Sequence, residues 1–103
     1  MELYKIAASN LNGIGINKLK KICNKTGGLK GVFEKSTKEI SELLEIKKDI
    51  VLKMQRKEAL ALAEQQLRFN RRYRIQTLYH EDSNYPALLK ECPDAPISLF
   101  FNK

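Results

Sequence analysis

The residues most able to do chemistry in this 103-residue sequence are the turn Gly13-Ile14-Gly15 and the lysines that follow it. Two glycines allow a tight turn and a close approach of the backbone to a ligand. A helix that begins just after Gly15 would present free N–H groups, and its dipole favours an anion at that end. Lys18, Lys20 and Lys21 add positive charge beside those groups. The pattern therefore predicts a phosphate-binding site.

The segments on either side of this turn predict two helices. Apolar residues recur at i, i+3 and i+4 from Leu3, and the first helix should end at Asn12-Gly13. The second helix is expected to start at Asn17 as its N-cap, to bury Leu19, Ile22 and Cys23, and to end at Thr26-Gly27-Gly28. This order is that of a helix-hairpin-helix, which grips phosphates and reads no bases. The predicted DNA-backbone-binding set is Gly13, Ile14 (also the core anchor of the hairpin), Gly15, Asn17, Lys18, Lys20 and Lys21.

The distribution of charge supports a polyanion as partner of the first part of the chain. The net charge is +7, from 19 Lys and Arg against 12 Asp and Glu. Residues 1–74 carry a balance of +9 and residues 75–103 a balance of −2. Two alternatives stay open: the Gly-Ile-Gly turn is also suited to packing two helices without a ligand, and the lysines can be a solvated face.

Further helices are expected between residues 29 and 72. Leu29, Val32 and Phe33 indicate a short helix, and Ser36 with Glu39 forms a capping box for the next, which buries Ile40, Leu43 and Leu44. After a break at 45–47, residues 48–72 contain no Gly or Pro and predict one long helix of roughly 37 Å. Its Arg-rich end is expected to project or to dock elsewhere.

The last thirty residues have a different pattern. Residues 75–79 alternate like a strand, 81–84 form a loop, Tyr85-Pro86 starts a short helix, and 97–101 predict a second strand. The expected fold is therefore mainly α (α+β): a helical domain over 1–73 with a long fourth helix, then a short two-stranded αβ segment over 74–103. The edge formed by Ile97, Leu99, Phe100 and Phe101 should pair with another chain or fold back on the helices, so self-association is a possibility.

The sequence offers little support for an enzyme. Cys23 and Cys92 form no CxxC motif, and His80 is the only histidine, so neither a zinc site nor a disulfide scaffold is expected. His80 has no nucleophile or metal pattern beside it. No cofactor is expected, because no phosphate loop or dinucleotide fingerprint occurs. Neither an apolar span nor a signal peptide fits, so a cytoplasmic location with no membrane contact is the expectation.

Two stretches of the tail carry a family resemblance. Asp82-Ser83-Asn84-Tyr85-Pro86-Ala87-Leu88-Leu89 and Pro93-Asp94-Ala95-Pro96-Ile97-Ser98-Leu99-Phe100 follow the Gly13-Ile14-Gly15 hairpin and the strand Arg74-Ile75-Gln76-Thr77-Leu78. In order and spacing, D-x-x-Y-P-x-x-L and P-D-x-P-x-x-L-F resemble the N-terminal region of the DprA (Smf) DNA-processing family. The resemblance covers essentially the whole chain.

The resemblance implies a helix-hairpin-helix or SAM-like helical domain followed by the first elements of an incomplete Rossmann-like domain. It further implies single-stranded DNA binding and help in loading the RecA recombinase during natural transformation. The main DNA-binding loop of the family lies in the Rossmann-like domain and does not occur in these residues. Two functions follow for this chain: an accessory DNA-backbone-binding module, or a protein-interaction or oligomerisation module with no DNA binding of its own.

Overall fold

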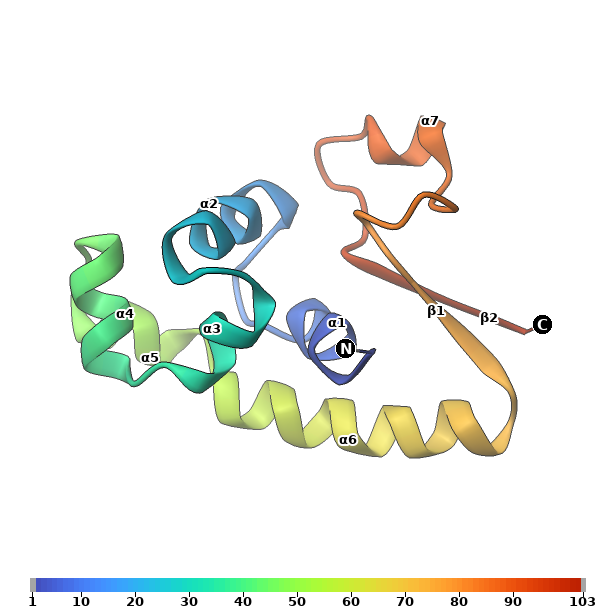
Figure 1. The fold of residues 1–103 in the computed structure, drawn as a ribbon, viewed down its shortest axis with the longest axis horizontal. Helices are drawn as coiled ribbons and strands as arrows, with labels where there is room; N and C mark the ends of the chain where they lie inside the picture. The colour runs from blue at the N-terminus through green and yellow to red at the C-terminus, as the bar shows by residue number, and fades with distance from the viewer. Residues whose placement is uncertain (1, 103) are drawn as a thin grey trace.

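Helices form most of the computed structural model, which describes residues 2–102. A two-stranded antiparallel sheet completes it, so the expected mainly α (α+β) class is confirmed (Figure 1). The elements are α1 Glu2–Ser9, α2 Ile16–Thr26, α3 Leu29–Glu34, α4 Thr37–Leu44, α5 Lys48–Lys53, α6 Arg56–Arg72, β1 Ile75–Tyr79, α7 Ala87–Lys90 and β2 Ser98–Asn102.

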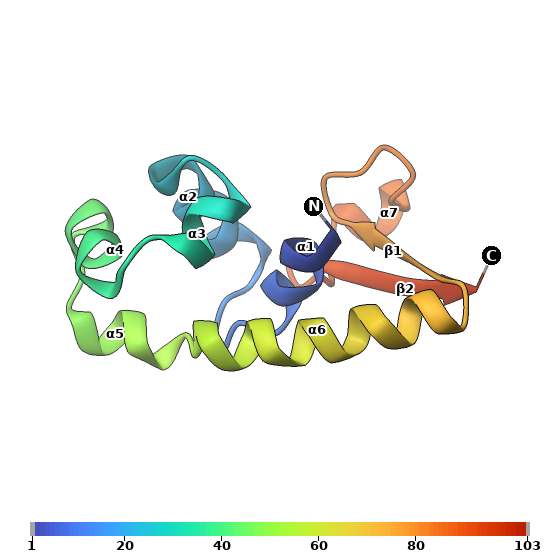
Figure 2. The same ribbon diagram turned by 60° about the horizontal axis from the view of Figure 1, so that its bottom comes forward.

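The core is built around α1. Its apolar stripe, Ile6, Ala7 and Ala8, is buried, and α1 lies on α6 and beside α3 (Figures 1 and 2). On α6 the buried side chains that belong to the core are the small Ala59 and Ala63, which let the backbones of two helices come close together. Short side chains on α6 therefore make room for α1.

The predicted end of α2 is confirmed. Gly27 adopts the left-handed conformation, and the N–H groups of Gly27 and Gly28 both donate to the carbonyl oxygen of Cys23 at 2.9 Å. α3 then turns back so closely that a Cβ on Gly31 would lie 2.1 Å from the carbonyl oxygen of Thr26. Only glycine allows this approach, and the sequence pattern does not reveal it.

The predicted capping box at the start of α4 is confirmed in both directions. The N–H of Glu39 donates to Ser36 Oγ at 3.1 Å, and the N–H of Ser36 donates to Glu39 Oε1 at 3.2 Å. These bonds lower the pKa of the Glu39 carboxyl. Ile40 is fully buried, Leu44 is partly buried and Leu43 stays exposed, so the predicted apolar stripe of this helix is only partly buried.

The prediction of one long helix over residues 48–72 is wrong. α5 ends at Lys53, and Gln55 takes a left-handed conformation (φ 54°) before α6 begins. The break is stabilised by Asn12, whose backbone N–H donates to the carbonyl oxygen of Met54 and whose side chain donates to that of Lys53, both at 3.0 Å. A residue far away in the sequence thus satisfies the carbonyls at the end of α5. α6 alone is about 25 Å long.

Arg56 fixes the start of α6 against the segment that joins α3 and α4. Its guanidinium donates to the carbonyl oxygens of Val32 at 3.0 Å and Lys35 at 2.6 Å, and to Thr37 Oγ1 at 3.3 Å. Burial lowers the pKa of this guanidinium, although its ordinary value is so high that it stays charged. Arg56 therefore joins α3, α4 and α6 at one point.

The predicted strands form and pair with each other. β1 and β2 are antiparallel, with Ile75 opposite Asn102 and Tyr79 opposite Ser98. The sheet lies over the C-terminal half of α6 and beside α1, where Ser98 Oγ donates to the carbonyl oxygen of Lys5 at 2.8 Å (Figure 2). Ile97 is buried, so the tail folds back on the helices, whereas Phe100 and Phe101 remain exposed.

The core continues across residue 74, the expected boundary between two domains. Tyr79 and Ile97 belong to the same buried cluster as the residues of α1, α2 and α6. At the end of α6, the fully buried Asn70 accepts a hydrogen bond from Gln66 Nε2 at 2.7 Å and donates to Thr77 Oγ1 at 3.5 Å. The Arg-rich end of α6 therefore docks on β1. Within residues 2–102, no helix combines the length and the apolar character needed to cross a membrane.

Candidate nucleic-acid interface

The turn between α1 and α2 is longer than expected, because α1 ends at Ser9 and not at Asn12-Gly13. Gly13 has a φ of +72°, a conformation that residues with a side chain rarely adopt. Ile14 packs only partly against the core, whereas Ile16, the first residue of α2, is 4% exposed. The predicted anchoring role of Ile14 is therefore shared with Ile16.

The start of α2 is open to solvent. The N-cap is Gly15 in an extended conformation, not Asn17 as expected, and no side chain caps the helix. Within residues 2–102, the N–H groups of Ile16, Asn17 and Lys18 donate to no acceptor. A Cβ added at Gly15 would meet no atom within 4 Å, and its φ of −88° suits any residue. The packing of the chain itself therefore does not require glycine at position 15.

A groove of about 490 Å³ runs from this turn to α5. Lys18 and Lys21, one helical turn apart on α2, lie along it together with Lys53 at the end of α5. None of its lining residues is acidic; the others are Asn12, Gly13, Ile14, Ile22, Leu44, Ile46, Ile50 and Met54. The groove thus combines an apolar floor with three lysine residues. Lys53 is absent from the predicted set, because no local spacing relates it to the hairpin.

Lys20 lies on a different face of α2. Its ammonium group is 3.5 Å from Glu81 Oε1, in the loop after β1. Of the predicted set, the groove therefore contains Gly13, Ile14, Lys18 and Lys21. Gly15 and Asn17 lie at the start of α2, and Lys20 points toward the acidic tail.

A second hollow, of about 340 Å³, lies at the start of α2. Gly15 and Ile16 share its lining with Asp94 and the segment 95–98. A carboxylate near the positive end of a helix interacts favourably with its dipole and repels other anions. Asp94 is therefore expected to weaken phosphate binding at the start of α2.

His80 and Cys23 lie away from the groove. His80 is 2% exposed, with Nδ1 3.2 Å from Glu81 Oε1 and its ring 5.1 Å from that of Tyr85. Its Nε2 atom has no hydrogen-bond partner within residues 2–102. Burial, and secondarily the Glu81 carboxylate, raises the pKa of the half-buried Cys23 thiol, so the unreactive thiol is favoured. In the described part of the chain, no three His, Cys, Asp or Glu residues cluster as metal ligands would.

Comparisons of the chain with protein-family models, with curated proteins and with solved structures found no match.

Proposed function

We propose that the α1–α2 hairpin binds the phosphate backbone of nucleic acid without reading its bases. The observation that carries this proposal is a groove lined by Lys18, Lys21 and Lys53, which includes Gly13 and Ile14 just before the start of α2. At that start the amides of Ile16, Asn17 and Lys18 donate to no acceptor within residues 2–102. A phosphate at this place accepts N–H hydrogen bonds from the helix start, and the lysines neutralise its charge. The absence of acidic residues from the groove lining further favours an anion.

The resemblance to the DprA (Smf) family gives this proposal its biological setting. In that setting the chain contributes an accessory backbone-binding module to a cytoplasmic DNA-processing protein. The whole protein binds single-stranded DNA and assists RecA loading in natural transformation. The hairpin is not an enzyme; it adds affinity to a DNA site located elsewhere.

The test is a titration of fluorescently labelled single- and double-stranded oligonucleotides at several salt concentrations. The double variant Lys18→Glu/Lys21→Glu should bind more weakly at every salt concentration. The logarithm of the association constant falls linearly with the logarithm of the salt concentration. Loss of two phosphate contacts should make this slope less steep by about 1.4 to 1.8. Both lysines are exposed, so the fold should be unchanged.

The matched control is Lys38→Glu/Lys57→Glu, which changes the net charge equally at two exposed lysines outside the groove. This control should lose much less affinity and keep its salt slope. Equal losses in the two double variants would show that only net charge matters and would refute the hairpin site.

A protein-interaction module is the second candidate, and the apolar floor of the groove favours it. Ile50 is 48% exposed there, and Ile14, Ile22 and Leu44 lie on the same floor. Apolar surface in a groove is typical of sites that receive an amphipathic helix. Absence of nucleic-acid binding even at low salt would support this candidate and exclude the first.

A further inference from the structure

One edge of β1 has unused hydrogen-bonding groups. In an antiparallel pair, alternate residues direct their N–H and C=O groups toward the partner strand. The N–H of His80 donates to the carbonyl oxygen of Ile97 at 2.8 Å, in register with the ladder. The alternation therefore turns the main-chain groups of Gln76 and Leu78 toward β2, and those of Ile75, Thr77 and Tyr79 away from it.

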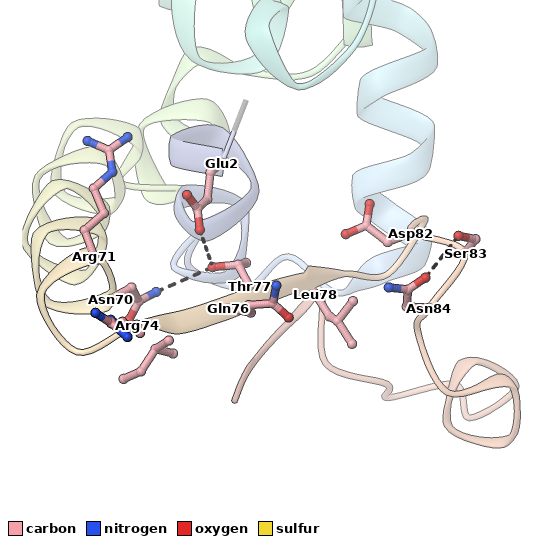
Figure 3. A pocket seen from close by; sticks show the side chains of 11 residues that line it. Glu2, Asn70, Arg71, Arg74, Gln76, Thr77, Leu78, Asp82, Ser83 and Asn84 are labelled. Carbon is pink, nitrogen blue, oxygen red and sulfur yellow. Dashed lines mark hydrogen bonds between the residues drawn. The ribbon is translucent and has the colours of Figure 1, made fainter. Parts of the chain in front are cut away.

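Asp82 satisfies the outward main-chain groups at only one end of this edge, those of Tyr79. Its Oδ2 accepts from the N–H of Tyr79 at 2.8 Å, and its own N–H donates to the carbonyl oxygen of Tyr79 at 2.8 Å. The N–H and C=O groups of Ile75 and Thr77 make no hydrogen bond within residues 2–102. They lie along an open groove of about 880 Å³ (Figure 3). Two donors and two acceptors are therefore available for another strand.

We infer that this edge pairs with β1 of a second copy of the chain, antiparallel, about a two-fold axis at Gln76. Under that symmetry, Ile75 faces the partner's Thr77, and Thr77 faces the partner's Ile75. Each of these pairs exchanges two hydrogen bonds, so all four outward groups of each copy are satisfied. The two sheets become one sheet of four strands.

The charges along the groove fit this symmetry. Arg71 and Arg74 lie at the α6 end, and neither forms an ion pair within residues 2–102. Asp82, Ser83 and Asn84 lie at the opposite end (Figure 3), where Asp82 pairs with Lys5 at 3.1 Å and Asn84 Oδ1 accepts from Ser83 Oγ at 3.2 Å. Carboxylate and amide oxygens have a second lone pair, so these acceptors can each take a further hydrogen bond. A two-fold axis between the ends places the arginines of each copy opposite the acceptors of the other. A second copy is therefore a better occupant than an arbitrary strand.

A disulfide at the axis tests this arrangement. The two Gln76 residues would form a directly opposed, non-hydrogen-bonded pair with Cα atoms about 4.5 Å apart, which a disulfide can bridge. We expect Gln76→Cys, in a Cys92→Ser background that removes the exposed native thiol, to form a covalent dimer under mild oxidation. The matched control is Gln65→Cys, an exposed position on α6, which should stay largely monomeric. Equal cross-linking of the two variants would overturn the proposal.

Sedimentation equilibrium of the full chain gives an independent result. Because two lysines would face each other at the axis, Gln76→Lys should weaken the dimer by about fivefold or more. Gln76 is exposed, so the monomer should keep its fold and its stability. A wild-type chain that stays monomeric up to millimolar concentration, or a dimer unaffected by Gln76→Lys, would refute the pairing. Neither result bears on phosphate binding, since Gln76 does not line the groove beside α2.

Discussion

The side-chain amide of Asn12 donates a hydrogen bond to the carbonyl oxygen of Lys53 at 3.0 Å. Together with the backbone bond from Asn12 to Met54, this contact joins the α1–α2 turn to the end of α5. It also brings Lys53 close to Lys18 and Lys21, which belong to a different part of the chain. The groove proposed to bind phosphate therefore depends on a contact between residues 41 positions apart.

Replacement of Asn12 by alanine should destabilise the chain. The variant loses the bond to Lys53 and leaves a helix-end carbonyl to solvent, for a loss of about 1 kcal/mol in the free energy of unfolding. Urea denaturation followed by circular dichroism measures this. Asn17→Ala is the control, because Asn17 is exposed and its side chain makes no hydrogen bond within residues 2–102. If both variants lose the same stability, the Asn12 bond does not hold the turn.

Gly31→Ala should be far more damaging than Gly15→Ala. The new Cβ at position 31 meets the Thr26 carbonyl oxygen at 2.1 Å, so α2 and α3 must move apart. Overpacking of this kind costs about 1–3 kcal/mol. At position 15 the Cβ meets nothing within 4 Å, so only the poorer capping of α2 by alanine, about 0.5 kcal/mol, should be lost. Gly15→Ala should instead weaken nucleic-acid binding, because the added methyl lies where a phosphate would approach the amides. Unchanged affinity would argue against backbone contact at that position.

Asp94→Asn should strengthen nucleic-acid binding. Asp94 lines the same hollow as Gly15 and Ile16, where its charge opposes a phosphate at the start of α2. Removal of one nearby repulsive charge should raise the affinity about two- to fivefold at low salt, with less effect at high salt. The oligonucleotide titration measures this, and Asp49→Asn, an exposed carboxylate on α5, is the control. An equal gain in both variants would mean that the position of the charge is irrelevant.

The chain should lose stability at alkaline pH through Tyr79. Burial, followed by the nearby charges of Cys23, Glu81 and Asp82, raises the pKa of Tyr79 from 10.0 to about 12. Between these two values the folded state holds a proton that the unfolded state has released, so stability falls as the pH rises. Denaturation midpoints between pH 9.5 and 12 should decline less steeply for Tyr79→Phe than for the wild type. Parallel curves would show that Tyr79 ionises equally in both states.

The sequence by itself determined the local elements and the pattern of charge. The capping box of Ser36 and Glu39, the end of α2 at Gly27 and the alternation in β1 depend on contacts within a few residues, and each is present. The Gly13 turn likewise follows from a backbone conformation, φ +72°, that strongly favours glycine. Such features can be predicted because nearby side chains and backbone groups are enough to stabilise them.

Only the tertiary structure decided where α5 ends and which lysines share a surface. Residues 48–72 have good helix propensity throughout, but Asn12 and Arg56 offer the backbone long-range hydrogen bonds that favour a break at Gln55. Helical periodicity already places Lys20 on a different face from Lys18 and Lys21. The ion pair of Lys20 with Glu81 and the position of Lys53 on the groove of the other two lysines come from the tertiary structure. These outcomes depend on partners distant in the chain, which neither periodicity nor composition can reveal.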